Sequence, residues 1–191
     1  MNTGTERCVR AVIANSAHVP SVKGVASRRT ASAALLALGG LALALGVVVY
    51  ASDRDPAGVA LLPAVAVLHT GPLFGALGQW LPSFVHPFAF SLFTAVALGP
   101  SASPAYRACV GWWLVNVAFE VGQHPRVSVV IVRALDDAGS NNWLRWLTRP
   151  LTNYFQSGMF DMGDLVAVTA GALSAAGVLY LVHRAEASYD G

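Results

Sequence analysis

The chain has 191 residues and a net charge of +2, and 55% of its residues are hydrophobic whereas only 12% are charged. A soluble domain usually carries about 25% charged residues, so this composition excludes an ordinary soluble protein and indicates an integral membrane protein. The small net charge, with no basic stripe between aromatic residues, argues against nucleic-acid binding. Cys8 and Cys109 lack the spacing of a disulfide pair or a metal knuckle.

The first 30 residues are polar and show no periodicity, so we expect a flexible tail. Basic residues gather before the first apolar stretch, and the positive-inside rule therefore places the N-terminus in the cytoplasm. They are Arg7, Arg10, Lys23, Arg28 and Arg29.

Four stretches approach the roughly 20 mostly apolar residues needed to cross about 30 Å of hydrocarbon. The expected fold is all-α, a polytopic transmembrane helical bundle forming one domain over residues 31–185, with spans at about 31–50, 81–98, 105–122 and 165–183. The first span also resembles a signal peptide cleaved near Ser52, but its length favours a retained anchor. A fifth span is open at residues 56–80, which are charge-free but interrupted by Pro63 and Pro72. A short embedded or re-entrant segment is preferred there, because little room remains for a turn.

Polar residues gather where the second and fourth spans start and the third span ends. Successive spans alternate in direction, so these three points must face the same side of the membrane. We call this predicted set the polar rim. Its ionisable members are His86, Glu120, Asp161 and Asp164, and its further polar members are Asn116, Gln123 and His124.

Glu120 is the only acidic residue in the apolar stretch 108–122. An ionisable group at the bilayer centre costs about 2.5–3.5 kcal/mol on insertion scales, so it needs a partner, a wet cavity or a function. One hypothesis makes His86, Glu120, Asp161 and Asp164 catalytic residues, or ligands of a divalent metal that activates water. The alternative is structural: Glu120 as a paired or protonated acid, the aspartates as helix N-terminal charges, and His86 as an interfacial residue.

The fourth span carries small residues every four positions, at Gly163, Ala167, Gly171 and Ala175. Such a ladder permits close helix contact and is expected to bring the two aspartates against the third span. In the second span, Pro87 is expected to kink the helix next to His86.

The connection 124–163 is long enough to have structure of its own. Its first part, Val127–Val132, is β-branched and apolar, whereas Asn142–Gln156 has the three- and four-residue apolar spacing of an amphipathic helix with a kink at Pro150. This segment is expected to rest on the membrane surface or to cover the polar rim as a lid.

Three motifs resemble the VanZ-like family of small bacterial membrane proteins: LPSFVHPFAFS around His86, FEVGQ around Glu120, and FDMGDLVAVTAG from Asp161 to Gly171. The resemblance covers about residues 81–175. It implies a four-helix protein of the bacterial inner membrane, in a family with one type linked to glycopeptide resistance and with no established reaction. The chain differs from the family in its longer third loop and in lacking an acidic residue before the histidine.

Two functions are expected. The first is a cell-envelope component whose rim binds membrane lipids or a lipid-linked, amphiphilic small molecule. The alternative is a membrane-embedded, metal-dependent hydrolase or transferase acting on a lipid-like substrate. A proton-coupled carrier is less favoured, because few polar residues cross the membrane.

Overall fold

The computed structural model describes residues 22–53, 73–99, 101–140 and 143–189. This part of the chain is all-α, as predicted, and has no β-strand. Its helices are α2 (Val22–Asp53), α3 (Ala76–Leu98), α4 (Ala102–Gly122), α5 (Pro125–Gly139), α6 (Arg145–Ser157) and α7 (Met162–Tyr189).

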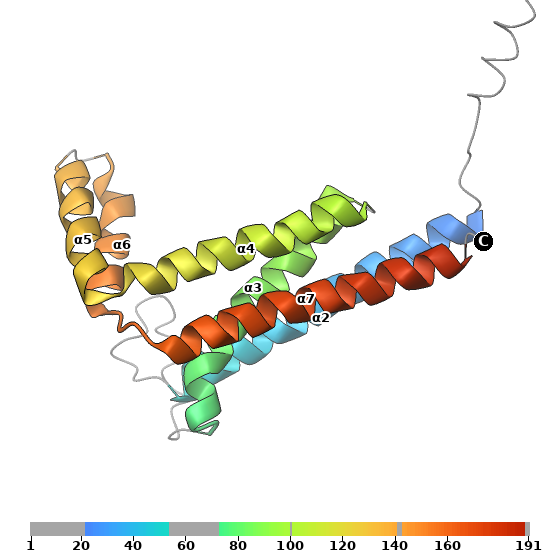
Figure 1. Cartoon of the computed structure of the whole chain (residues 1–191), viewed down its shortest axis with the longest axis horizontal. Helices are drawn as coiled ribbons and strands as arrows, with labels where there is room; N and C mark the ends of the chain where they lie inside the picture. Colours follow the sequence, from blue (N-terminus) through green and yellow to red (C-terminus); the bar gives the residue numbers. More distant parts are fainter. Residues whose placement is uncertain (1–21, 54–72, 100, 141–142, 190–191) are drawn as a thin grey trace, which may run out of the picture.

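The four longest helices alternate in direction, as Figure 1 shows. The end of α2, the start of α3, the end of α4 and the start of α7 lie at one end of the molecule, which we call the rim end. The Asp53 carboxylate accepts hydrogen bonds from the backbone N–H groups of Leu73 (2.8 Å) and Phe74 (3.0 Å), which joins the end of α2 to the turn before α3. The chain therefore leaves α2 and enters α3 at the same end.

Three of the described helices are long and apolar enough to cross a membrane, over Arg28–Asp53, Ala76–Leu98 and Met162–Ser188. Their outer faces carry large apolar side chains that the protein leaves uncovered, such as Leu41 (70% exposed) and Leu173 (68% exposed). The third predicted span, α4, is not among the three. Its 21 residues reach about 31 Å, but Arg107, Asn116 and Glu120 lower its hydropathy.

Helix α3 lies at the centre, because α2, α4 and α7 all pack against it. On α7, Gly171 lies directly against the Phe84 carbonyl and the Pro87 ring of α3, where an added Cβ atom has no space. On α2, Gly46 faces the Val85 side chain less tightly, since an added Cβ atom would lie 3.3 Å from Val85 Cγ1. The small-residue ladder of α7 thus gives close contact as expected, but with α3, not with the third predicted span.

Helix α4 is fixed to both neighbours by tryptophans that donate hydrogen bonds. Trp112 Nε1 donates to Thr94 Oγ1 of α3 at 2.8 Å, and Trp113 Nε1 donates to Thr169 Oγ1 of α7 at 3.1 Å. Hydroxyl acceptors between apolar helices satisfy the indole N–H groups without exposing them to water. The buried core next to these contacts is formed by Leu35, Phe88, Leu92, Ala95, Ala105, Cys109, Ala175 and Leu179.

Two predicted boundaries were wrong. Helix α2 begins at Val22, so residues 22–30 are helical and do not belong to the tail. Helix α3 begins at Ala76 rather than at residue 81, which places His86 ten residues, about 15 Å, inside the helix. Pro82 and Pro87 both lie within α3, and the helix continues through them.

The long connection forms a helical hairpin of α5 and α6, which stands at a steep angle to α4 and α7 (Figure 1). Thr152 Oγ1 of α6 donates to the Asp136 carboxylate of α5 at 3.4 Å, and Gly139 lies directly against Thr148. Helix α6 agrees with the predicted amphipathic segment. The β-branched run Val127–Val132 lies within α5, a helix that the sequence did not predict.

Several predictions fall on residues 1–21 and 54–72, outside the described residues. The first is the flexibility of the N-terminal tail, together with the part of a cleavable signal peptide that this tail would form. The second is a fifth span or a re-entrant segment at 56–80. For the last, the described flanks agree with α3 following α2 as the next span.

Candidate functional site

Two aspartates of the polar rim are held by α3. Asp164, in the first turn of α7, accepts a hydrogen bond from Ser83 Oγ at 2.7 Å, and Asp161, just before α7, accepts one from Trp80 Nε1 at 3.2 Å. Gly163 lies against the Trp80 indole, where a side chain would find no space. The glycine therefore allows the indole to reach the carboxylate.

Asp161 also caps α7. Its Oδ1 accepts from the backbone N–H of Gly163 at 2.9 Å, which satisfies a donor that has no partner within the helix. This backbone hydrogen bond, and then the one from Trp80, lower the pKa of the Asp161 carboxyl below its ordinary value of 3.8. Asp161 is therefore a carboxylate at neutral pH, placed at the helix end that favours negative charge.

Glu120 is the least satisfied group of the site. It is only 9% exposed, and its Oε2 has no hydrogen-bond partner among the described residues. The charges of Asp164 and Asp161 both act on it across the gap between α4 and α7. It also lies in the last turn of α4, where the helix dipole opposes negative charge. A buried carboxyl oxygen in this position needs a proton or a donor from outside the protein.

Helix α6 covers the end of α4 next to Glu120. Gln123 Nε2 donates to the Tyr154 hydroxyl at 2.5 Å, and the Phe119 and Phe155 rings stack 5.8 Å apart. Phe155 lies directly over Gly122, which has no side chain to obstruct it. Burial, and then the charge of Glu120, raise the pKa of the Tyr154 phenol above its ordinary value of 10.0. Tyr154 is therefore a neutral neighbour of Glu120.

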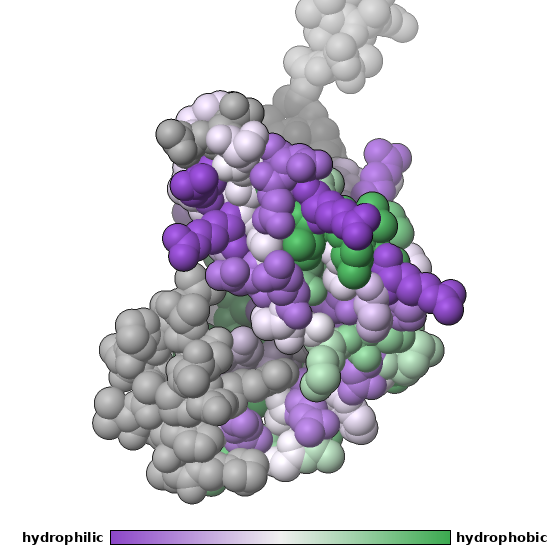
Figure 2. Space-filling view, turned by 90° about the vertical axis from the view of Figure 1, so that its left-hand side faces the viewer, coloured by the Kyte–Doolittle hydropathy of each residue, from purple (hydrophilic) through white to green (hydrophobic). Residues whose placement is uncertain are grey.

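Hydrophilic side chains gather at the rim end. Figure 2 looks onto it and shows them over its upper part, where the α5–α6 hairpin lies, with hydrophobic side chains beside them. Trp143 (71% exposed) and Trp146 (74% exposed) extend from the α6 side of the hairpin. Exposed tryptophans next to arginines such as Arg145 and Arg149 are typical of a membrane interface.

Two predicted rim residues have local structural roles instead. Asn116 Nδ2 donates to the Trp112 carbonyl of its own helix at 2.7 Å. His124 caps α5, where its Nδ1 accepts from the backbone N–H of Arg126 at 3.3 Å, and its ring packs against Phe160. Neither side chain joins the three carboxylates in any contact within the described residues.

The predicted metal site is not formed. Among the described residues, no three His, Cys, Asp or Glu side chains lie close enough to hold a metal ion. His86 is exposed on α3, where its ring stacks on Phe90 (6.0 Å), which in turn stacks on Trp112 (4.8 Å). His86 is only three residues beyond Ser83, which reaches Asp164, so the difference lies in direction: the His86 ring stacks on Phe90 of its own helix.

Sequence reasoning missed Trp80, Ser83 and Tyr154. The sequence contained a signal for the first two. Trp80 and Ser83 are three residues apart and share one side of α3, and the same three-residue spacing separates Asp161 from Asp164 at the start of α7. Tyr154 was assigned to the apolar side of an amphipathic helix, and only the docking of α6 on α4 turns its hydroxyl toward Gln123.

Comparison of the chain with protein-family models, with curated proteins and with solved structures finds no match. The expectation of a VanZ-like protein thus rests on the sequence motifs around His86, Glu120 and Asp161 alone.

Proposed function

We propose that this chain is a VanZ-like protein of the bacterial inner membrane that binds an amphiphilic molecule at the rim end, through a headgroup carrying N–H or O–H donors. The observation that carries this proposal is the buried Glu120 carboxyl oxygen without a partner. Around it, Asp161 and Asp164 add further acceptors. A headgroup with amine or hydroxyl donors satisfies these oxygens, whereas a bare phosphate is repelled by them.

The surroundings support an amphiphile over a wholly soluble ligand. Glu120 lies between apolar helix faces, and the Phe119, Tyr154 and Phe155 rings pack around the end of α4. The α5–α6 hairpin, with its exposed tryptophans, lies across the direction of α7, as expected of a segment resting on the membrane surface (Figure 1). A molecule with one polar end and one apolar end fits both parts.

The proposed topology has four spans, with α4 as the third, the N-terminus in the cytoplasm and the rim end outside. Arg28 and Arg29 at the start of α2 support this orientation by the positive-inside rule. The four arginines of α5 and α6 lie at the other end and oppose this orientation, whereas Arg107 and Arg184 join Arg28 and Arg29 at the proposed cytoplasmic end. The hydrogen bonds from Leu73 and Phe74 to Asp53 support α2 and α3 as consecutive antiparallel spans.

Binding of phosphatidylethanolamine and phosphatidylcholine to the purified protein in detergent tests this proposal. Both lipids carry the same phosphate and chains, but only the ethanolamine headgroup has N–H donors. We expect a clear preference for phosphatidylethanolamine, lost in Glu120→Gln and kept in Asp137→Asn, which removes an exposed carboxylate of α5. Equal binding of the two lipids, or an unchanged preference in Glu120→Gln, contradicts the proposal.

A further inference from the structure

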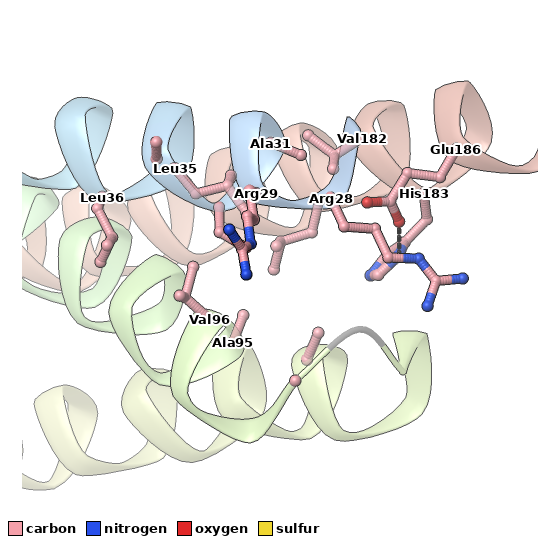
Figure 3. Close-up of a pocket in the computed structure, with 15 residues that line it drawn as sticks. Arg28, Arg29, Ala31, Leu35, Leu36, Ala95, Val96, Val182, His183 and Glu186 are labelled. Carbon is pink, nitrogen blue, oxygen red and sulfur yellow. Dashed lines mark ion pairs between the residues drawn. The ribbon is translucent and has the colours of Figure 1, made fainter. Parts of the chain in front are cut away.

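A cavity lies at the end of the molecule opposite to the rim end. It has a volume of about 460 Å³, is open on one side, and is lined by the start of α2, the end of α3, the start of α4 and the end of α7 (Figure 3). It is separate from Glu120 and the two rim aspartates, none of which lines it.

Most of the cavity wall is apolar. Leu35 and Leu36 of α2, Val96 of α3 and Val182 of α7 line it. Leu36 is 46% exposed, so the wall continues onto the outer, lipid-facing surface of the helices. An acyl chain can therefore enter from the bilayer without passing through water.

Two arginines stand at the polar side of this cavity. Figure 3 shows the Arg28 and Arg29 side chains pointing from α2 into the space between α2 and the connection from α3 to α4. The membrane-crossing stretch of α2 begins at Arg28, so both guanidinium groups lie at the depth of lipid phosphates if α2 spans. Guanidinium groups bind phosphate oxygens through two parallel hydrogen bonds.

The opposite wall adds one histidine–carboxylate contact and one unsatisfied atom. His183 Nδ1 lies 3.6 Å from the Glu186 carboxylate, and His183 Nε2 is buried with no hydrogen-bond partner in the described part of the chain. Among the described residues, the side chains lining the cavity include two arginines and one carboxylate, Glu186, so the charges of the lining sum to a positive value.

We propose that this cavity binds an anionic phospholipid of the surrounding membrane, with its phosphate at Arg29 and one acyl chain along Leu35, Leu36 and Val96. The charge of the arginines matches the phosphate, and the apolar wall matches the chain. The occupant comes from the bilayer because the wall is continuous with the lipid-facing surface. This site has a preference opposite to that of the rim end, where carboxylates repel an anionic headgroup.

Lipid retained by the purified protein tests this site. The protein is reconstituted with equal amounts of phosphatidylglycerol and phosphatidylcholine of identical chains, extracted in detergent, and its bound lipid is measured by mass spectrometry. We expect preferential retention of phosphatidylglycerol, reduced about fivefold in Arg29→Gln, the effect of losing one cation near a membrane surface. Ala33→Trp, which places a large side chain in the cavity wall, is expected to reduce retention of both lipids.

Arg107→Gln is the matched control, because Arg107 is an exposed cation at the same end of the molecule and does not line the cavity. It should retain phosphatidylglycerol as the wild type does, and so should Glu120→Gln, which separates this site from the proposed rim function. Equal retention of the two lipids by the wild type overturns the proposal, as does an unchanged preference in Arg29→Gln. Displacement of the lipid by millimolar glycerol phosphate also overturns it, by identifying a soluble phosphate ester as the ligand.

Discussion

Ser83 Oγ of α3 donates a 2.7 Å hydrogen bond to the Asp164 carboxylate of α7, between residues 81 positions apart in the chain. This contact fixes the start of α7 against α3 and holds one carboxylate of the rim in place. Trp80 and Asp161 repeat the arrangement one turn closer to the helix ends. Two hydrogen bonds therefore hold both aspartates of the rim against α3.

Removing the Ser83 hydroxyl should destabilise the α3–α7 pair. A hydrogen bond to a charged group contributes about 1.5–3 kcal/mol, so Ser83→Ala is expected to lower the unfolding free energy by about that amount. A double-mutant cycle with Asp164→Asn, measured by denaturation in detergent, should show that the two effects are not additive. Ser174→Ala, on the exposed side of α7, serves as the control. Strictly additive effects contradict this pairing.

Two glycines of α7 should respond differently to the same change. Gly171→Ala places a methyl group against the Phe84 carbonyl of α3, whereas the space beside Gly177 is open. Overpacking costs about 1–3 kcal/mol, so Gly171→Ala should destabilise the protein by that amount. Gly177→Ala should be neutral or stabilising, because alanine favours a helix. Similar unfolding temperatures for the two variants would be inconsistent with the α3–α7 contact.

The Asp161–Trp80 contact should persist well into the acidic range. The pKa of the Asp161 carboxyl is depressed below 3.8, so its stabilising effect is complete above that pH and is lost as the pH falls through the lower, folded-state pKa. The Trp80 contribution to fluorescence, obtained as the difference between wild type and Trp80→Phe, should stay constant from pH 7 to about 4. A transition above pH 4 in that difference signal argues against this hydrogen bond.

Glu120→Gln should not lower stability. Most substitutions of buried residues destabilise a protein by about 1 kcal/mol or more. Here the amide replaces an acid that has two carboxylates nearby and no partner for Oε2 in the described residues, so the unfolding temperature is expected to equal or exceed that of the wild type. A marked decrease would identify Glu120 as a structural partner of another group.

The sequence predicted the four long helices and the meeting of three helix ends, because hydrophobic length can be read from the chain directly and successive spans must alternate in direction. It did not predict which helix receives the small-residue ladder of α7. Gly171 can face either neighbour, and only the packing of α2, α3 and α4 together selects α3.

The candidate site was predicted in part for a similar reason. Asp161, Asp164 and Glu120 are grouped by topology alone. His86 was included because the apolar stretch was read as starting at residue 81, whereas the helix begins at Ala76 and the imidazole stacks on Phe90 within it. Tyr154 could not be assigned before the docking of α6 on α4 was known, since that contact depends on Gly122 leaving space for Phe155.

The most direct test of the account is the sidedness of the helix ends in the membrane. Single cysteines introduced into a cysteine-free chain, by Leu73→Cys, Arg126→Cys and Met159→Cys at the rim end and by Ser103→Cys and Ser188→Cys at the opposite end, are labelled with an impermeant maleimide in oriented vesicles. We predict that the first three positions react from one side and the last two from the other. Reaction of the three rim positions from different sides contradicts a shared rim.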